Sequence, residues 1–251
     1  MDNLTHTLAG VAIARMGLDK KVTGATLTLA LGSNLPDLDI VSGFWGNVAY
    51  LEHHRGLSHA FSASPFLAGG LALVFSRWPR SNRRFVPTFL VAWLAVSLHI
   101  VFDLWTSYGT RALLPFDATW YSWDWIFIMD PALLLLLVVA CFGARWFRFG
   151  GANRWAMAGT LAYVALRSGA HALAEGQAQA IVGPEFDVVR ALPDPLSPNR
   201  WRLVARSAES FATGYVPVIG VSRSKVTFPR VKPDAVVSRA AHESRAARVF
   251  L

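Results

Sequence analysis

The chain has 251 residues, of which 53% are hydrophobic and 16% are charged, and its mean hydropathy is +0.36. This composition is typical of a membrane protein and unlike that of an ordinary soluble one. The formal charge of +8 comes from short loops and the C-terminal segment, without the interleaved aromatic residues of a nucleic-acid surface, so no nucleic-acid partner is expected. The single cysteine excludes a disulfide framework and a thiolate metal site, which leaves His, Asp and Glu for any chemistry.

Apolar stretches follow one another in chain order, most of them near the roughly 20 residues that cross a hydrocarbon core. The first is short and could cross only with tilt or local thinning of the bilayer, or lie partly embedded. The second carries an acidic run in its last third, so its helix is expected to end near Leu35. The stretches are 4–18, 24–43, 60–76, 85–104, 126–144 and 155–174.

After Ala180 the composition changes to short, β-branched and partly alternating segments separated by Pro, Gly, Asp and Asn. The pattern is typical of a small β-rich domain. The sequence therefore predicts an all-α polytopic membrane helix bundle of about five to six helices over residues 1–178 and a small β-rich extramembrane domain over 179–251.

Basic residues gather in alternate connections between the apolar stretches. Such loops are typically cytoplasmic, so the near-neutral connections 44–59 and 105–125 are expected to face outward, as is the C-terminal domain if the sixth stretch spans the membrane. The basic set is Arg15, Lys20, Lys21, Arg77, Arg80, Arg83, Arg84, Arg145, Arg148 and Arg154.

Orientation fixed from Arg and Lys alone places the His, Asp and Glu residues of the apolar stretches together at the outward face. On a helix, His99 and Asp103 share one face about 5–6 Å apart, and burying an unpaired carboxylate there is unfavourable without pairing, protonation or a cation. An Asn-x-Pro-Asp run is also an ordinary turn, but the convergence favours a metal site. The expected metal ligands are His6, Asp37, Asp39, His54, His59, His99 and Asp103.

A second tier of residues has two readings. Asp130 is either a ligand or, as the sequence favours, the cap of a helix beginning at Pro131. His171 and Glu175 are either ligands or, for Glu175, part of a network with Arg167.

Two arginines near the outward face also have two readings. Arg55 and Arg111 could clamp an anionic headgroup, or they could pair at the interface with Glu52 or Asp117.

Four motifs occur in order: THTLAG at 5–10, NLPDLD at 34–39, HRGLSH at 54–59 and HIVFD at 99–103, which SYGTRALLPF continues at 107–116. In these motifs the chain resembles the YdjM-like, LexA-regulated bacterial inner-membrane proteins, which are described as membrane-bound metal-dependent hydrolases. The resemblance is strong over residues 1–145 and looser beyond them. It implies a multi-pass protein of the inner membrane. Family members often run longer, which leaves open whether the C-terminal domain is complete.

Hydrolysis at the outer face of the inner membrane is the expected function. Cations at the site would polarise a phosphoryl or carbonyl oxygen and activate water, with Asp39, His54 and Arg55 as the expected catalytic residues. The mixed ligands favour Zn, with Mn or Fe as alternatives. A distant similarity to the zinc-dependent phospholipase C class suggests a phosphoester of a lipid or envelope-associated amphiphile. The alternatives are a metal or proton transporter and a non-catalytic, metal-stabilised scaffold or sensor.

Overall fold

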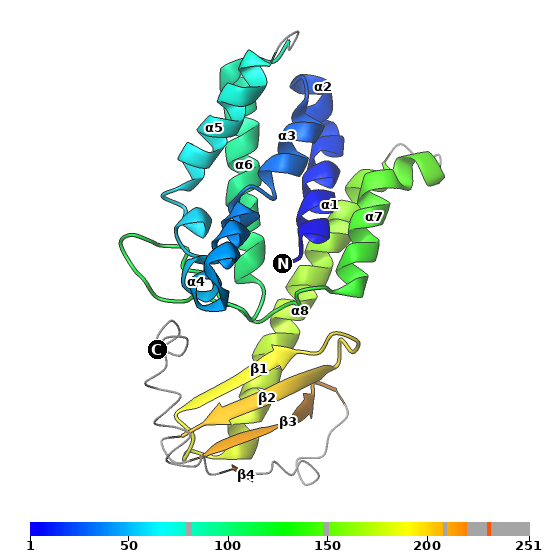
Figure 1. Cartoon of the computed structure of the whole chain (residues 1–251). Coiled ribbons are helices and arrows are strands. Elements are labelled where there is room, and N and C mark those ends of the chain that lie inside the picture. The colour runs from blue at the N-terminus through cyan, green and yellow to red at the C-terminus, as the bar shows by residue number, and fades with distance from the viewer. Residues whose placement is uncertain (79–81, 148–150, 208–209, 220–229, 232–251) are drawn as a thin grey trace.

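The structure, a computed structural model, describes residues 1–78, 82–147, 151–207, 210–219 and 230–231. It consists of a helical bundle with a small antiparallel sheet beyond one end (Figure 1), as the sequence predicts. The helical segments are α1 (Asn3–Ile13), the π-helical turn η1 (Ala14–Leu18), α2 (Asp19–Lys21), α3 (Ala25–Gly32), the 3-10 helix η2 (Pro36–Trp45), α4 (Asn47–His53), η3 (Leu57–His59), α5 (Ser64–Arg77), α6 (Phe85–Leu104), α7 (Pro131–Trp146) and α8 (Ala152–Val182).

Most of the helices are shorter than the apolar stretches suggest. The stretch expected to be helical from residue 24 is an α-helix only over α3, because Pro36 begins the separate 3-10 helix η2. The first stretch loses regular α geometry at Gly17, where φ is 122°. Within the described residues, α6 alone is long and apolar enough to cross a membrane, and the bent pair of residues 47–59 and 64–77 would add one more if counted as a single span. The polytopic arrangement therefore stays a prediction.

Small residues bring α1, α3 and α6 into close contact. A Cβ atom added at Gly10 of α1 would lie 2.7 Å from the carbonyl oxygen of Leu29 in α3, and one added at Gly32 would lie 2.9 Å from Cβ of Ala95 in α6. Helices in membranes commonly associate through such residues because the backbones can then approach closely. This contact holds the C-terminal end of α3, and the acidic segment that follows it, beside α6.

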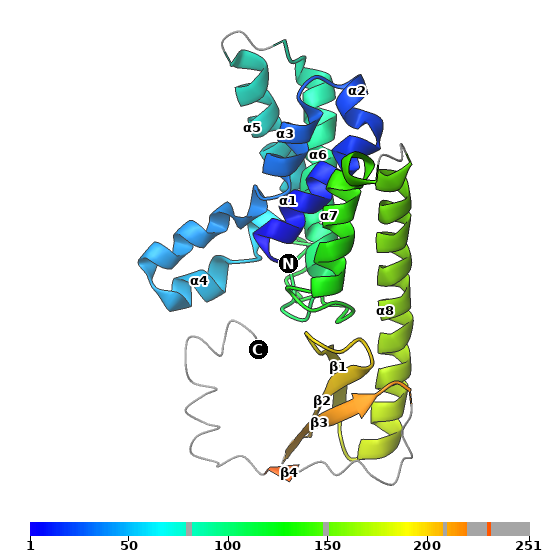
Figure 2. The same cartoon turned by 90° about the vertical axis from the view of Figure 1, so that its right-hand side faces the viewer.

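The C-terminal sheet is carried by α8. With 31 residues, this helix is about 46 Å long, so it extends well beyond the rest of the bundle (Figure 2). The strands β1 (Val188–Pro193), β2 (Arg200–Arg206), β3 (Phe211–Pro217) and β4 (Arg230–Val231) pair antiparallel in that order. Ala178 and Val182 of α8 pack against Leu203 and Val216 of the sheet. The boundary expected between residues 178 and 179 thus falls inside α8. Of the β-rich domain expected over residues 179–251, residues 208–209, 220–229 and 232–251 lie outside the described residues.

Basic and acidic features lie at opposite ends of the bundle. The helix ends that border the basic connections, namely α2, the end of α5, the start of α6, the end of α7 and the start of α8, are at the top of Figure 1. The start of α1, η2, α4 and the end of α6 lie at the other end, next to the sheet. The His and Asp residues of the four motifs therefore share one end of the fold.

The contact at Gly10 generates a stability prediction. Replacing Gly10 with Ala should lower the free energy of unfolding by about 1–3 kcal/mol, because the added methyl group meets the α3 backbone. Gly70→Ala in α5 is the matched control, since nothing in the described part of the chain lies within 4 Å of its added Cβ and alanine favours a helix by up to about 1 kcal/mol relative to glycine. Melting temperatures of the detergent-purified variants measure the difference. Equal melting temperatures would show that the α1–α3 contact is not tight.

Candidate metal centre

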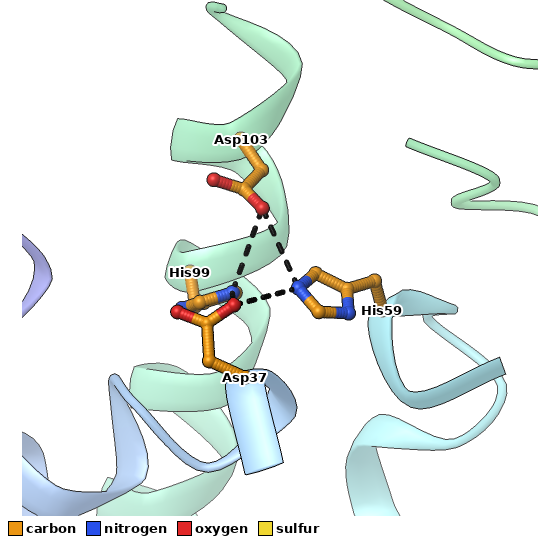
Figure 3. Close-up of side chains that lie close together, drawn as sticks. All are labelled: Asp37, His59, His99 and Asp103. Carbon is orange, nitrogen blue, oxygen red and sulfur yellow. Dashed lines mark hydrogen bonds and ion pairs between the residues drawn. The ribbon is translucent and has the colours of Figure 1, made fainter. Parts of the chain in front are cut away.

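Four side chains from three separate elements converge at the end of α6 (Figure 3). Asp37 comes from η2, His59 from η3, and His99 and Asp103 from the last turns of α6. One ligand atom of each lies within 4.8 Å of the other three. His59 Nε2 is 3.2 Å from Asp37 Oδ1 and 3.5 Å from Asp103 Oδ2, while His99 Nε2 is 3.7 Å and 3.6 Å from the same two oxygens.

These separations suit a single cation bound by all four side chains. Donor atoms held about 2.0–2.1 Å from a tetrahedral zinc ion are roughly 3.3–3.4 Å from one another. The measured values of 3.2, 3.5, 3.6 and 3.7 Å lie on both sides of that separation. Two imidazoles and two carboxylates are also a donor set that transition metals accept. The cluster of Asp and His residues could therefore hold a metal ion.

A hydrogen bond sets the orientation of His99. Its Nδ1 donates to the carbonyl oxygen of Ser33 over 2.6 Å, so Nε2 carries the lone pair that faces the cluster. Both His99 Nε2 and Asp37 Oδ2 are buried, and neither has a hydrogen-bond partner among the described residues. Because a buried polar atom without a partner is unfavourable, these atoms fit a cation as their missing partner.

Asp39 organises the loop that carries His59. Its carboxylate accepts hydrogen bonds from His54 Nδ1 at 2.8 Å, the backbone N–H of Arg55 at 3.0 Å and Ser58 Oγ at 2.7 Å. His59 Nδ1 lies 3.1 Å from the same carboxylate. The backbone of Arg55, with φ of 57°, lies in the left-handed region that aims its N–H at Asp39. A carboxylate behind the far ring nitrogen of a ligand histidine is a common feature of metal sites.

Both aspartates of η2 are held in the ionised form. Burial by itself raises the pKa of Asp39, but hydrogen bonds from His54 and His59 outweigh it and hold the pKa below its usual range. Burial likewise opposes ionisation of Asp37, and its hydrogen bond with His59 and the nearby His99 lower its pKa. A cation would therefore find these carboxylates already charged.

Asp37, Asp39 and His54 form a second group whose ligand atoms lie within 4.8 Å of one another. This group shares Asp37 with the first cluster, so the two could bind neighbouring ions. However, the oxygens of Asp39 already accept the hydrogen bonds that hold the loop. In this structure Asp39 therefore positions His59 and His54.

His6 and Arg55 flank the four-ligand cluster. His6 stacks on His99 with ring centroids 3.9 Å apart, and its Nε2 lies 3.3 Å from Asp103 Oδ1. The buried Arg55 places Nε 3.2 Å from Asp103 Oδ2 and donates from its guanidinium to Thr106 Oγ1 at 3.1 Å. The structure thus gathers all seven expected ligands at one place, with His6 beside the first cluster rather than within it.

The second-tier residues take other roles. Asp130 caps α7 by accepting a hydrogen bond from the backbone N–H of Leu133 at 3.0 Å, which confirms the capping interpretation. His171 Nε2 lies 3.4 Å from Glu175 Oε1. Neither metal-competent group found among the described residues contains Asp130, His171 or Glu175.

Arg167 does not form the expected pair with Glu175. Its guanidinium donates to the carbonyl oxygens of Trp125 at 3.2 Å and Pro198 at 2.8 Å and lies 4.4 Å from the centre of the Trp201 ring. This buried arginine therefore joins α8 to the loop before α7 and to the sheet. The sequence suggests a carboxylate partner. Backbone carbonyl groups occur at every residue, so the sequence does not indicate which of them bind an arginine.

Arg111 also bonds to the backbone. It contacts the carbonyl oxygen of Glu52 and stacks over the ring of Trp120 at 4.8 Å. Asp117 accepts instead from the hydroxyl group of Tyr121. Among the described residues, neither Arg55 nor Arg111 therefore pairs with Asp117.

Three groups at the site were not expected from sequence. The carbonyl of Ser33 orients His99, Ser58 supports Asp39, and the Tyr108 ring lies 4.8 Å from the Arg55 guanidinium. Ser58 lies inside the HRGLSH motif and Tyr108 is the second residue of the segment SYGTRALLPF, so the sequence motifs indicated both positions. The Ser33 carbonyl offered none.

Comparisons with known proteins bear on the same region. A family model described as YdjM inner membrane protein matches residues 1–174. An uncharacterized protein, YfhP of Bacillus subtilis (strain 168), is 30% identical over 159 residues, which cover 60% of this chain and 47% of the relative. The chain thus spans about half the length of this curated relative. No solved structure matches the chain.

The cluster geometry predicts the effect of removing single ligands. His99→Ala and Asp37→Ala should each lower the affinity for zinc by at least about 100-fold, because each removes a donor atom, while the helices stay folded. The His171→Ala variant should keep the wild-type metal content, because His171 lies outside the cluster. Elemental analysis after detergent purification and zinc reconstitution measures this. Wild-type protein without metal after reconstitution would rule out the site.

Proposed function

Because this chain belongs to the YdjM inner membrane protein family, we propose that it is a metal-dependent hydrolase of the bacterial inner membrane. The family membership confirms the resemblance drawn from the four sequence motifs. The observation that supports hydrolysis most directly is the cluster of Asp37, His59, His99 and Asp103, with His99 oriented by the Ser33 carbonyl. A divalent cation, most simply zinc, would supply Lewis-acid polarisation of a phosphoryl or carbonyl oxygen there.

Side chains around the cluster provide the remaining functions of a hydrolytic site. His54 donates from Nδ1 to Asp39, which leaves Nε2 to accept a proton from water or return one to a leaving group. The Arg55 guanidinium, buried beside Asp103, supplies a positive charge that suits an anionic substrate. Asp39 positions both His54 and His59, so its contribution to the reaction is the placement of other groups.

The exposed side chains of the helices support insertion in a membrane. Large apolar side chains are exposed on every long helix, which in a bundle facing water would be unfavourable, whereas lipid accepts them. We propose that the bundle crosses the membrane several times, with the basic connections in the cytoplasm and the cluster and sheet on the outer side. The exposed apolar set includes Leu73, Val74, Leu90, Trp93, Leu135, Leu161 and Leu166.

An apolar cavity of about 350 Å³ beside the cluster supports a lipid substrate. It is lined by α1, α6, α7 and α8 and runs from Thr5 and Phe102 at the cluster end to Met16 and Leu94 toward the opposite end. Thr5 precedes the flanking His6, and Phe102 precedes Asp103. A hydrocarbon chain in this cavity would bring an attached headgroup near the metal-binding end. A phosphoester of a lipid or an envelope-associated amphiphile is therefore the substrate class we propose.

Transport of a metal ion or proton is the competing function, because ionisable residues within membrane helices often mark ion pathways. The metal-competent groups of the described residues gather at one end of the bundle and do not continue along it. This arrangement favours a reaction at one membrane face over a pathway across the membrane. A non-catalytic metal-stabilised scaffold would have the same cluster and no activity.

The proposed orientation predicts which cysteines an impermeant thiol reagent can label in intact cells. In a Cys141→Ala background, a cysteine at position 118 in the connection after α6 should be labelled from outside, and one at position 20 should be labelled only after the membrane is permeabilised. Ala118 and Lys20 are both exposed, so labelling reports sidedness rather than burial. The reverse pattern would place the cluster in the cytoplasm and end the proposal for an outer-face reaction.

The hydrolase assignment predicts release of a headgroup from labelled envelope lipids or hydrolysis of generic phosphodiesters. Zinc-loaded wild type and His171→Ala should be active, whereas His99→Ala and chelated wild type should fall to the background rate, because both lack the bound cation. Release is measured by chromatography of the labelled products. Metal-loaded protein that is inert on a broad panel yet moves metal across liposomes would show a transporter instead.

A further inference from the structure

A helical arm projects sideways from the bundle at the cluster end. It consists of η2 and α4, residues 36–53, which pack against each other and stand away from the other helices in Figure 2. Its first residues carry Asp37 and Asp39, so the arm is continuous with the candidate metal centre.

The apolar side chains of η2 form a face that is exposed in the described structure. A 3-10 helix has three residues per turn, so Leu38, Val41 and Phe44 lie above one another, and all three are exposed. Phe44 is 89% exposed, and Trp45 at the tip is 76% exposed. The polar Ser42 is buried instead. The arm therefore turns its apolar side outward, the reverse of a helix in water.

No charged residue occurs from Ile40 to Leu51, so no charge on the arm tip opposes contact with hydrocarbon. A neighbouring loop adds exposed apolar side chains, Leu113 and Phe116. Backbone hydrogen bonds tie that loop to the segment after the arm, from Phe61 N–H to the Ala112 carbonyl at 3.0 Å and from Arg111 N–H to the Arg55 carbonyl at 3.1 Å. The apolar features thus belong to one end of the molecule.

We propose that this arm lies in the membrane–water interface, with Phe44 and Trp45 inserted among the lipid acyl chains of the bilayer that α6 crosses. The chain belongs to an inner membrane protein family, so a lipid surface adjoins the helices from which the arm projects. Trp and Phe on an uncharged tip are typical of segments that insert into this region. The proposal does not depend on hydrolysis.

The arm would also set the depth of the metal centre. Asp37 and Leu38 are adjacent on η2, so a helix anchored through its apolar face holds the aspartates at the level of the lipid headgroups. With the orientation and substrate proposed above, an amphiphile in the outer leaflet would then meet the cluster without leaving the bilayer, and this last step rests on the proposed function.

Spin labels measure this depth directly in the full chain reconstituted in vesicles of phosphatidylethanolamine and phosphatidylglycerol. In a Cys141→Ala background, a label on Phe44→Cys should collide several-fold more with oxygen, which concentrates in hydrocarbon, relative to a water-soluble nickel complex, than a label on Leu196→Cys. Leu196 is the matched control because it is apolar and 84% exposed but lies in the sheet region. Ile40→Cys provides a second arm position if the Phe44 variant does not fold.

Two outcomes would overturn the proposal. A label at position 44 or 40 that meets the nickel complex as often as the label at 196 would place the arm in water. A label shielded from both reagents would place it in a protein contact, and cross-linking between labelled copies would then identify self-association. Metal content equal to wild type confirms that each variant retains the cluster.

Discussion

Burial of Asp103 in α6 is the constraint on which the rest of this site depends. A carboxylate inside an apolar helix requires compensation, and the structure provides it from several sides: the Met1 ammonium group and His6 at the start of α1, His59 on η3 and Arg55 after α4. These partners come from different segments, so satisfying this one group fixes how α1, α6 and the loop before α5 meet. The close contacts of Gly10 and Gly32 then bring α3 near enough for Asp37 to join.

Much of this arrangement could be predicted from sequence. The bounds of α6 match the expected stretch 85–104, because that stretch has no Gly, no charge before Asp103 and only an early Pro87. The convergence of His and Asp residues at one end also followed from the alternation of basic and neutral connections. Both inferences rest on long-range composition, which membrane helices express strongly.

Local geometry was harder to predict. The helix α4 lies in a connection of near-neutral, mixed composition. The 3-10 form of η2 places Leu38, Val41 and Phe44 directly above one another, whereas α-helical spacing would spread them over about 120° of the helix surface. The roles of Asp39 and Arg167 depend on backbone N–H and carbonyl groups, which every residue possesses. The sequence indicates which side chains can bind a metal or transfer a proton. The path of the backbone determines which of these side chains face the metal site and which orient the neighbouring side chains.

The contacts of His59 with Asp37 and Asp39 limit which sequence changes this protein can accept during evolution. Asp37 Oδ1 lies 3.2 Å from Nε2 of the ring, and Asp39 Oδ2 lies 3.1 Å from Nδ1, so one short helix holds both nitrogens of a single imidazole. Inserting or deleting one residue between the aspartates would rotate one of them by about a third of a turn and release the ring. The spacing of one residue between these two acids is therefore constrained by the size of the imidazole ring.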